Sequence, residues 1–269
     1  MSAQVAVQLR LEREKYLLYE SIPAVVQVNN YSAQAFLLED QESAPWLRMQ
    51  VVRQDGRRVP PVGPGILAGS QRIEPGQAVA REVDLVAFYQ IREIGRYRVN
   101  ATVRVAGVGG LFASNERIIE VLNGRVLWTK TVGVAEEGKP RLSTYSLLVL
   151  RVEPHDWLYA RIEDAQAGVI YGVVRLGASV LLAPPRAETD KESNLHVLHQ
   201  VAPRHYRYAV LSPRAACVKQ ASYSDFESRP DLAREEGGEV KVVGGELIGP
   251  AGAQRPKPPG PPQPPPEKP

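Results

Sequence analysis

Three of the four histidines in the chain lie close together, and imidazole is a common ligand of metal ions in proteins. His196, His199 and His205 follow Asp190 in one short stretch. A structural zinc site needs about four ligands that converge on one point. Residues three apart in a strand point to opposite faces, so His196 and His199 are expected to diverge. The spacing therefore argues against a complete metal site.

A hairpin would still allow two of these histidines to meet. If the chain turns at residues 202–204, residues 199–200 come to lie opposite residues 205–206. His199 and His205 could then face each other across two strands. Two imidazoles do not complete a zinc site, so a metal-dependent hydrolase centred on this pair is the weakest function that we consider. We predict no cofactor.

The single cysteine is the other candidate for reactive chemistry. Cys217 has small, apolar neighbours, Ala215, Ala216 and Val218. A low-pKa thiol needs exposure and nearby positive charge, so we predict a buried and inert side chain. The sequence also contains neither a Gly-x-Ser-x-Gly elbow nor a glycine-rich phosphate loop before a helix. Together these observations predict a protein that is not an enzyme.

Aromatic and basic residues alternate in the run from His205 to Tyr208, and such a run could stack on nucleic-acid bases. In a strand, however, Tyr206 and Tyr208 share one face, and His205 and Arg207 share the other. One buried aromatic face and one wet basic face explain the pattern without a ligand. The formal net charge of +3 gives no strong attraction to nucleic acid either. No nucleic-acid partner is predicted.

The elements that position all these residues are strands. Between Tyr97 and Val105 every second residue is apolar, and polar residues stand between them. This period of two indicates a half-buried strand. Gly95 precedes it, where the chain must turn sharply. The stretch from Glu82 to Val105 thus predicts the end of one strand, a tight corner and one long strand.

Comparable strands are predicted along most of the chain. In the first half they cover residues 5–14, 22–31, 46–54, 79–85, 97–105, 111–121 and 124–134, and in the second half residues 143–152, 157–163, 169–176, 179–182, 195–201, 205–211, 217–223 and 239–243. A short helical turn is expected at Pro230–Glu236. About seven strands with regular turns are typical of an immunoglobulin-like β-sandwich. The predicted fold is all-β: one such sandwich, then a second antiparallel β domain built as a meander or sandwich.

One part of the first half resembles a known group of domains. The run Leu85-x-x-x-Tyr89-x-Ile91-x-x-x-Gly95-x-Tyr97-x-Val99 is similar to the corner of bacterial immunoglobulin-like sandwiches. These include the macroglobulin-type domains of alpha-2-macroglobulin-like proteins and the proteinase-inhibitor type. The opening from Leu17 to Pro23, followed by Val26-x-Val28-x-Asn30, is similar to their first two strands. The resemblance covers roughly residues 5–134 and implies a sandwich that serves as a spacer, adhesion module, inhibitor or enzyme appendage.

Polar residues with Gly138 and Pro140 predict a domain boundary at residues 135–140. The predicted domains are residues 1–135, a sandwich, residues 141–248, a second all-β domain, and residues 249–269, a proline-rich tail. No apolar run is long enough to predict a membrane span. Small residues before Gln4 resemble the end of a signal-peptidase site. We therefore expect a removed leader and a periplasmic or secreted protein.

The tail differs in composition from the rest of the chain, because ten of its residues from 249 to 269 are proline. Such a segment forms a stiff polyproline II spacer or remains disordered, and it can dock into an aromatic groove of a partner. Arg255 and Lys257 place positive charge at the start of the proline run. The candidate partner-binding residues are Arg255, Pro256, Lys257, Pro258, Pro259, Pro261 and Pro262.

The function that these patterns favour is a non-enzymatic binding or structural module of the cell envelope or the secreted space, with another protein as its partner. The main alternative is a proteinase inhibitor, since the first domain resembles that type. An inhibitor needs an exposed, rigid loop that enters a protease cleft, and the best candidate is Pro60–Ile66. The sequence leaves both functions open.

Overall fold

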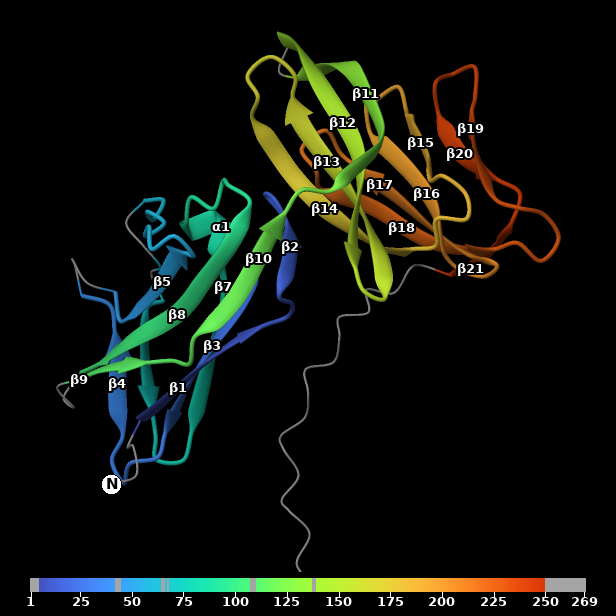
Figure 1. Cartoon of the computed structure of the whole chain (residues 1–269). Helices are drawn as coiled ribbons and strands as arrows, with labels where there is room; N and C mark the ends of the chain where they lie inside the picture. The colour runs from blue at the N-terminus through green and yellow to red at the C-terminus, as the bar shows by residue number, and fades with distance from the viewer. Residues whose placement is uncertain are drawn as a thin grey trace, which may run out of the picture. The chain divides into compact units, whose positions relative to one another are not determined.

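The chain folds almost entirely into β-strands (Figure 1). The computed structural model describes residues 5–41, 45–63, 66, 68–106, 110–136 and 139–249. Contacts within the chain divide it into two compact units: residues 1–179 with 213–216, and residues 180–212 with 217–269. The predicted all-β fold is confirmed.

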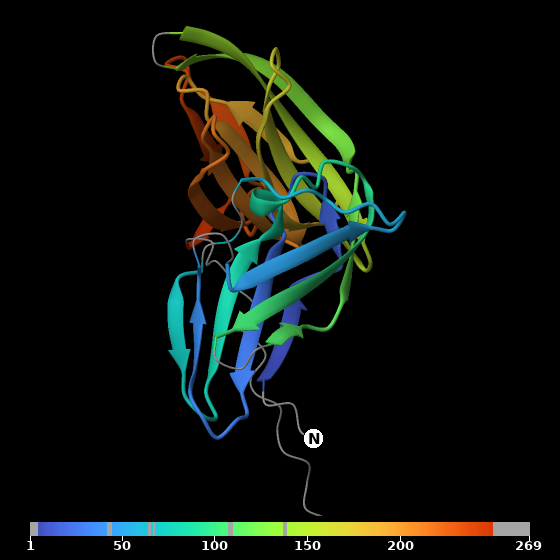
Figure 2. The ribbon, with the colours of Figure 1, turned by 90° about the vertical axis from the view of Figure 1, so that its left-hand side faces the viewer.

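The first unit begins with a sandwich of two sheets, drawn from two directions in Figures 1 and 2. One sheet has the order β1 (Val5–Leu11), β3 (Pro23–Asn30) and β7 (Ala78–Asp84). The other has the order β2 (Lys15–Leu17), β10 (Arg117–Leu122), β8 (Gly95–Val105) and β5 (Leu47–Arg53). The strands β9 (Gly110–Ala113), β4 (Phe36–Glu39) and β6 (Ser70–Ile73) complete it, with β9 beside β8 and β4 paired to β6. This strand order is that of an immunoglobulin-like sandwich.

Alternation along the strands builds the core of this sandwich. The predicted inward face of β8 is buried throughout: Tyr97, Val99, Ala101, Val103 and Val105. Strand β3 alternates in the same way. Trp46 is fully buried at the start of β5, and its Nε1 donates a hydrogen bond to the carbonyl oxygen of Gly69 at 3.0 Å. The structure confirms the sequence's assignment of these faces.

The corner between β7 and β8 is held by two side chains. Asp84 caps the short helix α1 (Leu85–Phe88) by accepting a hydrogen bond from the Val86 amide. The Tyr97 hydroxyl donates to the carbonyl oxygen of Glu93 at 2.6 Å. Gly95 has a backbone φ of +145°, a value that residues with a Cβ rarely adopt, so the turn requires glycine at this position. A tyrosine bonded back to the backbone in this way is the tyrosine corner of immunoglobulin-like sandwiches.

A four-stranded sheet follows in the first unit, in the order β11 (Arg125–Glu136), β12 (Lys139–Val152), β13 (His155–Asp164) and β14 (Ile170–Ser179). Strands β11 and β12 form one antiparallel ladder, which runs from the pair Arg125–Val149 to the pair Glu136–Lys139. The predicted boundary at 135–140 therefore falls at the end of a hairpin within one sheet. The division of the chain into compact units comes instead after Ser179. The predicted limits of 1–135 and 141–248 differ from this division, and no described contact tests them as folding units.

Buried charges connect the sandwich to this second sheet. Glu20, whose side chain is 4% exposed, accepts hydrogen bonds from Arg13 Nη2 at 2.8 Å and from the Leu17 amide at 2.9 Å. Arg13 Nη1 also lies 3.4 Å from the hydroxyl of Tyr159 on β13. Burial, with the nearby Glu20 charge, raises the pKa of Tyr159 to about 12, so this phenol stays protonated. Glu20 therefore stabilises a contact between parts distant in sequence.

The second unit holds a five-stranded sheet and one separate pair. The sheet order is β15 (Arg186–Thr189), β16 (Leu195–Ala202), β17 (His205–Leu211), β18 (Cys217–Ser224) and β21 (Glu246–Gly249). The pair is β19 (Asp231–Arg234) and β20 (Val240–Val243). The helical turn predicted at Pro230–Glu236 is wrong, because the ladder between Asp231 and Val243 makes this segment a strand. Gly249, which the sequence places in the tail, is the last residue of β21.

We predict that Tyr97→Ala lowers the free energy of unfolding by about 3–5 kcal/mol, because it empties a large aromatic site in the core. Tyr97→Phe keeps the ring and loses the bond to Glu93, and should cost about 1 kcal/mol. Denaturant unfolding of both variants measures the difference. Equal losses in the two variants would show that the hydroxyl, and not the ring, holds the corner.

We also predict that Glu20→Gln costs about 3 kcal/mol, because it leaves the charge of Arg13 buried without its partner. The exposed pair of Arg72 and Glu74 is the matched control, with a separation of 2.7 Å. Glu74→Gln should cost less than about 1 kcal/mol, since water screens that pair. Similar losses at the two sites would contradict the assigned role of Glu20.

Candidate binding groove on strand β5

The predicted histidine pair does not form. The register of β16 and β17 places His199 opposite Arg207, and His205 opposite Ala202. The turn is tight and pairs Ala202 with His205, so His199, which lies three residues before Ala202, comes opposite Arg207. The expectation that His199 meets His205 is therefore wrong.

His196 has structural partners. Its Nδ1 lies 2.6 Å from the Tyr208 hydroxyl, and its Nε2 lies 3.0 Å from Oδ2 of Asp190. Asp190 in turn accepts hydrogen bonds from the Asn194 amide and side chain, which fixes the loop before β16. Within the described ranges, no group of three or more His, Cys, Asp or Glu side chains could hold a metal ion. As predicted, Tyr208 and Tyr206 are both buried.

The other predicted site residues have separate outcomes. Cys217 is exposed at the start of β18, so the prediction of a buried thiol is wrong. Small apolar neighbours in sequence did not imply burial, because this strand begins at the surface. The tail candidates Arg255 to Pro262 lie outside the described residues, and their role stays a prediction. No helix among the described residues is long and apolar enough to span a bilayer.

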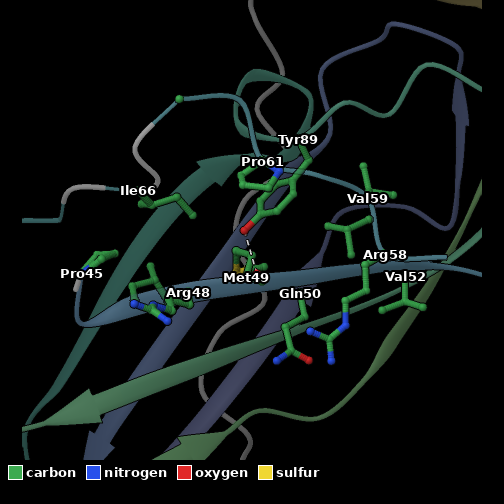
Figure 3. A pocket seen from close by; sticks show the side chains of 13 residues that line it. Pro45, Arg48, Met49, Gln50, Val52, Arg58, Val59, Pro61, Ile66 and Tyr89 are labelled. Atoms are coloured by element: carbon green, nitrogen blue, oxygen red, sulfur yellow. Dashed lines mark hydrogen bonds between the residues drawn. The ribbon is translucent and has the colours of Figure 1, made fainter. Parts of the chain in front are cut away.

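A groove along the outer side of β5 is the feature best suited to hold a ligand (Figure 3). It has a volume of about 330 Å³. Its walls come from β5 with Pro45 before it, from described residues between Arg58 and Gly63 together with Ile66, and from Tyr89 after α1. The lining residues are Pro45, Leu47, Arg48, Met49, Gln50, Val51, Val52, Arg58, Val59, Pro61, Gly63, Ile66 and Tyr89.

The groove exists because β5 is the last strand of its sheet. An antiparallel strand directs the backbone groups of alternate residues to opposite sides. At the two ends of β5 the bonds to β8 involve Trp46 and Gln54, so the even-numbered residues face β8. The backbone groups of Leu47, Met49, Val51 and Arg53 therefore face outward, toward the groove side.

The protein caps some of these outward groups. The Tyr89 hydroxyl donates to the Met49 carbonyl oxygen at 2.7 Å, as Figure 3 shows. The Val59 amide donates to the Val51 carbonyl oxygen at 2.8 Å, and the Arg53 amide donates to the Arg57 carbonyl oxygen at 2.8 Å. Burial raises the pKa of Tyr89, so its hydroxyl keeps the proton that it donates.

Three outward amides remain. No hydrogen bond to another described residue engages the N–H groups of Leu47, Met49 and Val51. The caps from Tyr89 and Val59 fall on carbonyl oxygens, and of the outward amides only that of Arg53 has a described acceptor. The groove side of β5 therefore has more free donors than free acceptors. Backbone amides that lack an acceptor are costly unless water or a ligand bonds to them.

Positive charge at the groove adds to this excess of donors. Arg48 and Arg58 are exposed and have no ion-pair partner among the described residues. The adjacent arginines are different, because Arg53 pairs with Glu93, and Arg57 lies 2.9 Å from Oδ2 of Asp55. The positive side of the groove is therefore available to a ligand.

Part of the groove wall was also predicted from the sequence to be functional, as the loop of a proteinase inhibitor. Of the segment Pro60–Ile66, predicted as an inhibitory loop, Pro61, Gly63 and Ile66 line the groove. Its described residues from Pro60 to Gly63 are exposed, and Ile66 is buried. The segment is anchored by bonds from the Val62 amide to Phe88 and from the Gln90 amide to Pro60. An exposed and anchored segment is compatible with inhibition, which stays a prediction. The groove itself was missed, because a sheet edge is invisible until the strand order is known.

Comparisons with known proteins add little. No family model matches the chain, and no curated protein matches it. One similar solved structure is Spo0M, a sporulation control protein from Bacillus subtilis, with 13% identity and a TM-score of 0.30 over 64% of this chain and 89% of that one. Another is the periplasmic chaperone SfaE, with 9% identity and a TM-score of 0.24 over 79% of this chain and 97% of that one. Both scores are too low to carry a functional argument.

Proposed function

We propose that the protein is a non-enzymatic binding module that takes an extended segment of another protein into the groove on β5. The observation that carries this proposal is the set of free amides on an edge strand beside an apolar wall. Such an edge is a template for one more strand, which supplies carbonyl oxygens to the amides. Side chains of the added segment would contact the apolar residues of the wall, among them Ile66 and Val59.

The caps limit where a segment can lie. Tyr89 and Val59 occupy the carbonyl oxygens of Met49 and Val51. A full ladder with donors and acceptors on both strands is therefore blocked over the second half of β5. The Leu47 carbonyl oxygen carries no such cap from a described residue. A bound segment would pair regularly near Leu47, and beyond it would mainly accept hydrogen bonds.

The lining also supports binding without catalysis. Its polar side chains are those of Arg48, Gln50, Arg58 and Tyr89. General acid–base and nucleophilic catalysis most often use His, Cys, Ser or a carboxylate, and the described part of the groove lining contains none of these. The proposed setting remains the cell envelope or the secreted space. The likeness to macroglobulin-type domains is part of the same proposal and rests on the sequence resemblance.

The test is selection of binding peptides from a library of random octapeptides, with the full chain as the target. We expect selected peptides to bind the wild-type chain and to lose most of their affinity for Gln50→Trp. Gln50 is exposed on β5, so an indole at this position would cover the groove without disturbing the core. Isothermal calorimetry measures both affinities.

Gln8→Trp is the matched control. Gln8 is exposed on β1, which is also an edge strand but lies in the other sheet. This variant should bind the selected peptides as the wild type does. Equal binding by wild type and Gln50→Trp would contradict the proposal, as would failure of the library to yield any groove-dependent peptide.

A further inference from the structure

We infer that the segment taken by the β5 groove is acidic, with carboxylates at alternate positions. This inference rests on the proposed function and names the chemistry of the partner. It comes from the chemical balance of the groove, where hydrogen-bond donors and positive charges outnumber acceptors. A carboxylate accepts hydrogen bonds at both oxygens and carries the complementary charge.

The backbone gives the first half of this argument. Of the groups on β5 that face the groove, the amides of Leu47, Met49 and Val51 are free of described partners. The carbonyl oxygens of Met49 and Val51 are already bonded to Tyr89 and Val59. The backbone of an added strand without charged side chains brings one amide donor for every carbonyl acceptor. Its amides would therefore face carbonyl oxygens of β5 that are already bonded within the chain. Carboxylate side chains supply acceptors without adding donors.

The guanidinium groups give the second half. Arg48 and Arg58 line the groove, and none of the described residues that line it is an Asp or a Glu. Nearby arginines are already neutralised, since Arg53 and Arg57 pair with Glu93 and Asp55. A guanidinium binds a carboxylate through two parallel hydrogen bonds, which are shorter and stronger than neutral ones. An acidic partner would therefore complete pairs that the chain itself leaves open.

The spacing of the charges sets the pattern of the partner. Arg48, Gln50 and Val52 alternate with buried residues along β5, and Arg58 pairs with Val52 in an isolated bridge. The two arginines are thus attached about four strand residues apart, or roughly 13 Å. In an extended segment, side chains on one face recur every second residue. Acids at alternate positions place one carboxylate within reach of each guanidinium.

The test uses three fluorescent peptides with the full chain. The acidic probe is acetyl-Thr-Val-Glu-Val-Glu-Val-Glu-Val-Thr-amide. The second has Gln in place of each Glu, and the third has Lys. We expect the acidic probe to bind at least about tenfold more tightly than the Gln probe, from charge-assisted hydrogen bonds. The preference should shrink at about 0.5 M salt, because salt screens exposed charges.

Variants assign this preference to the groove. Arg48→Gln and Arg58→Gln should each reduce the preference for the acidic probe by several-fold, because each weakens binding of the acidic probe more than binding of the Gln probe. Arg10→Gln is the matched control, because Arg10 is exposed on β1 and has no carboxylate partner among the described residues. It should change neither affinity. Loss of the preference in Arg10→Gln would indicate general surface charge and would overturn the inference.

The remaining outcomes separate this inference from the proposed function. If the Gln probe binds as tightly as the acidic one, and both are lost in Gln50→Trp, the groove binds segments but does not select acids. The inference then fails while the proposed function stands. If none of the three probes binds and the random library also fails, both fail together.

Discussion

Strand β5 has a neighbour on one side, and the properties of the groove follow from that constraint. Half of its backbone groups pair with β8, and the other half must find partners elsewhere. The chain supplies partners for carbonyl oxygens, from Tyr89 and from Val59. It leaves amides. An edge treated in this way resists pairing with a second copy of itself, because a full ladder needs both kinds of group.

The core of the sandwich holds β5 and its capping residues in place. Tyr89 can cap Met49 because the corner between β7 and β8 is held by Asp84 and Tyr97. Trp46, buried at the start of β5, fixes the beginning of the strand. The groove thus depends on side chains that are buried for reasons of stability. Arg48 and Arg58, whose side chains have no ion-pair partner among the described residues, supply the charge.

Local patterns predicted much of the fold. The alternation from Tyr97 to Val105 identified the buried face of β8, and the turn at Gly95 predicted the corner. Most strands longer than about five residues were found, because their alternation extends over enough positions. Several short strands, such as β2 and β15, were missed for lack of such a pattern. The pairing of Asp231 with Val243 converted an expected helical turn into a strand.

The site could not be predicted in the same way. Met49 and Tyr89 are 40 residues apart, and their bond depends on which strand is last in the sheet. The tight turn pairs Ala202 with His205, which leaves His199 opposite Arg207. Cys217 is exposed although its sequence neighbours are apolar. Edge position, register and exposure are properties of the assembled sheets, so a single sequence does not display them.

Amide hydrogen exchange along β5, resolved by residue, distinguishes free outward amides from amides that bond to β8. We predict an alternation: the amides of Arg48, Gln50 and Val52, which bond to β8, should exchange slowly, and those of Met49 and Val51 should exchange faster. A bound acidic segment should slow the exchange of Met49 and Val51. Uniformly slow exchange along β5 in the free protein would show that the outward amides already have partners, and the groove would then have no free donors for a bound segment.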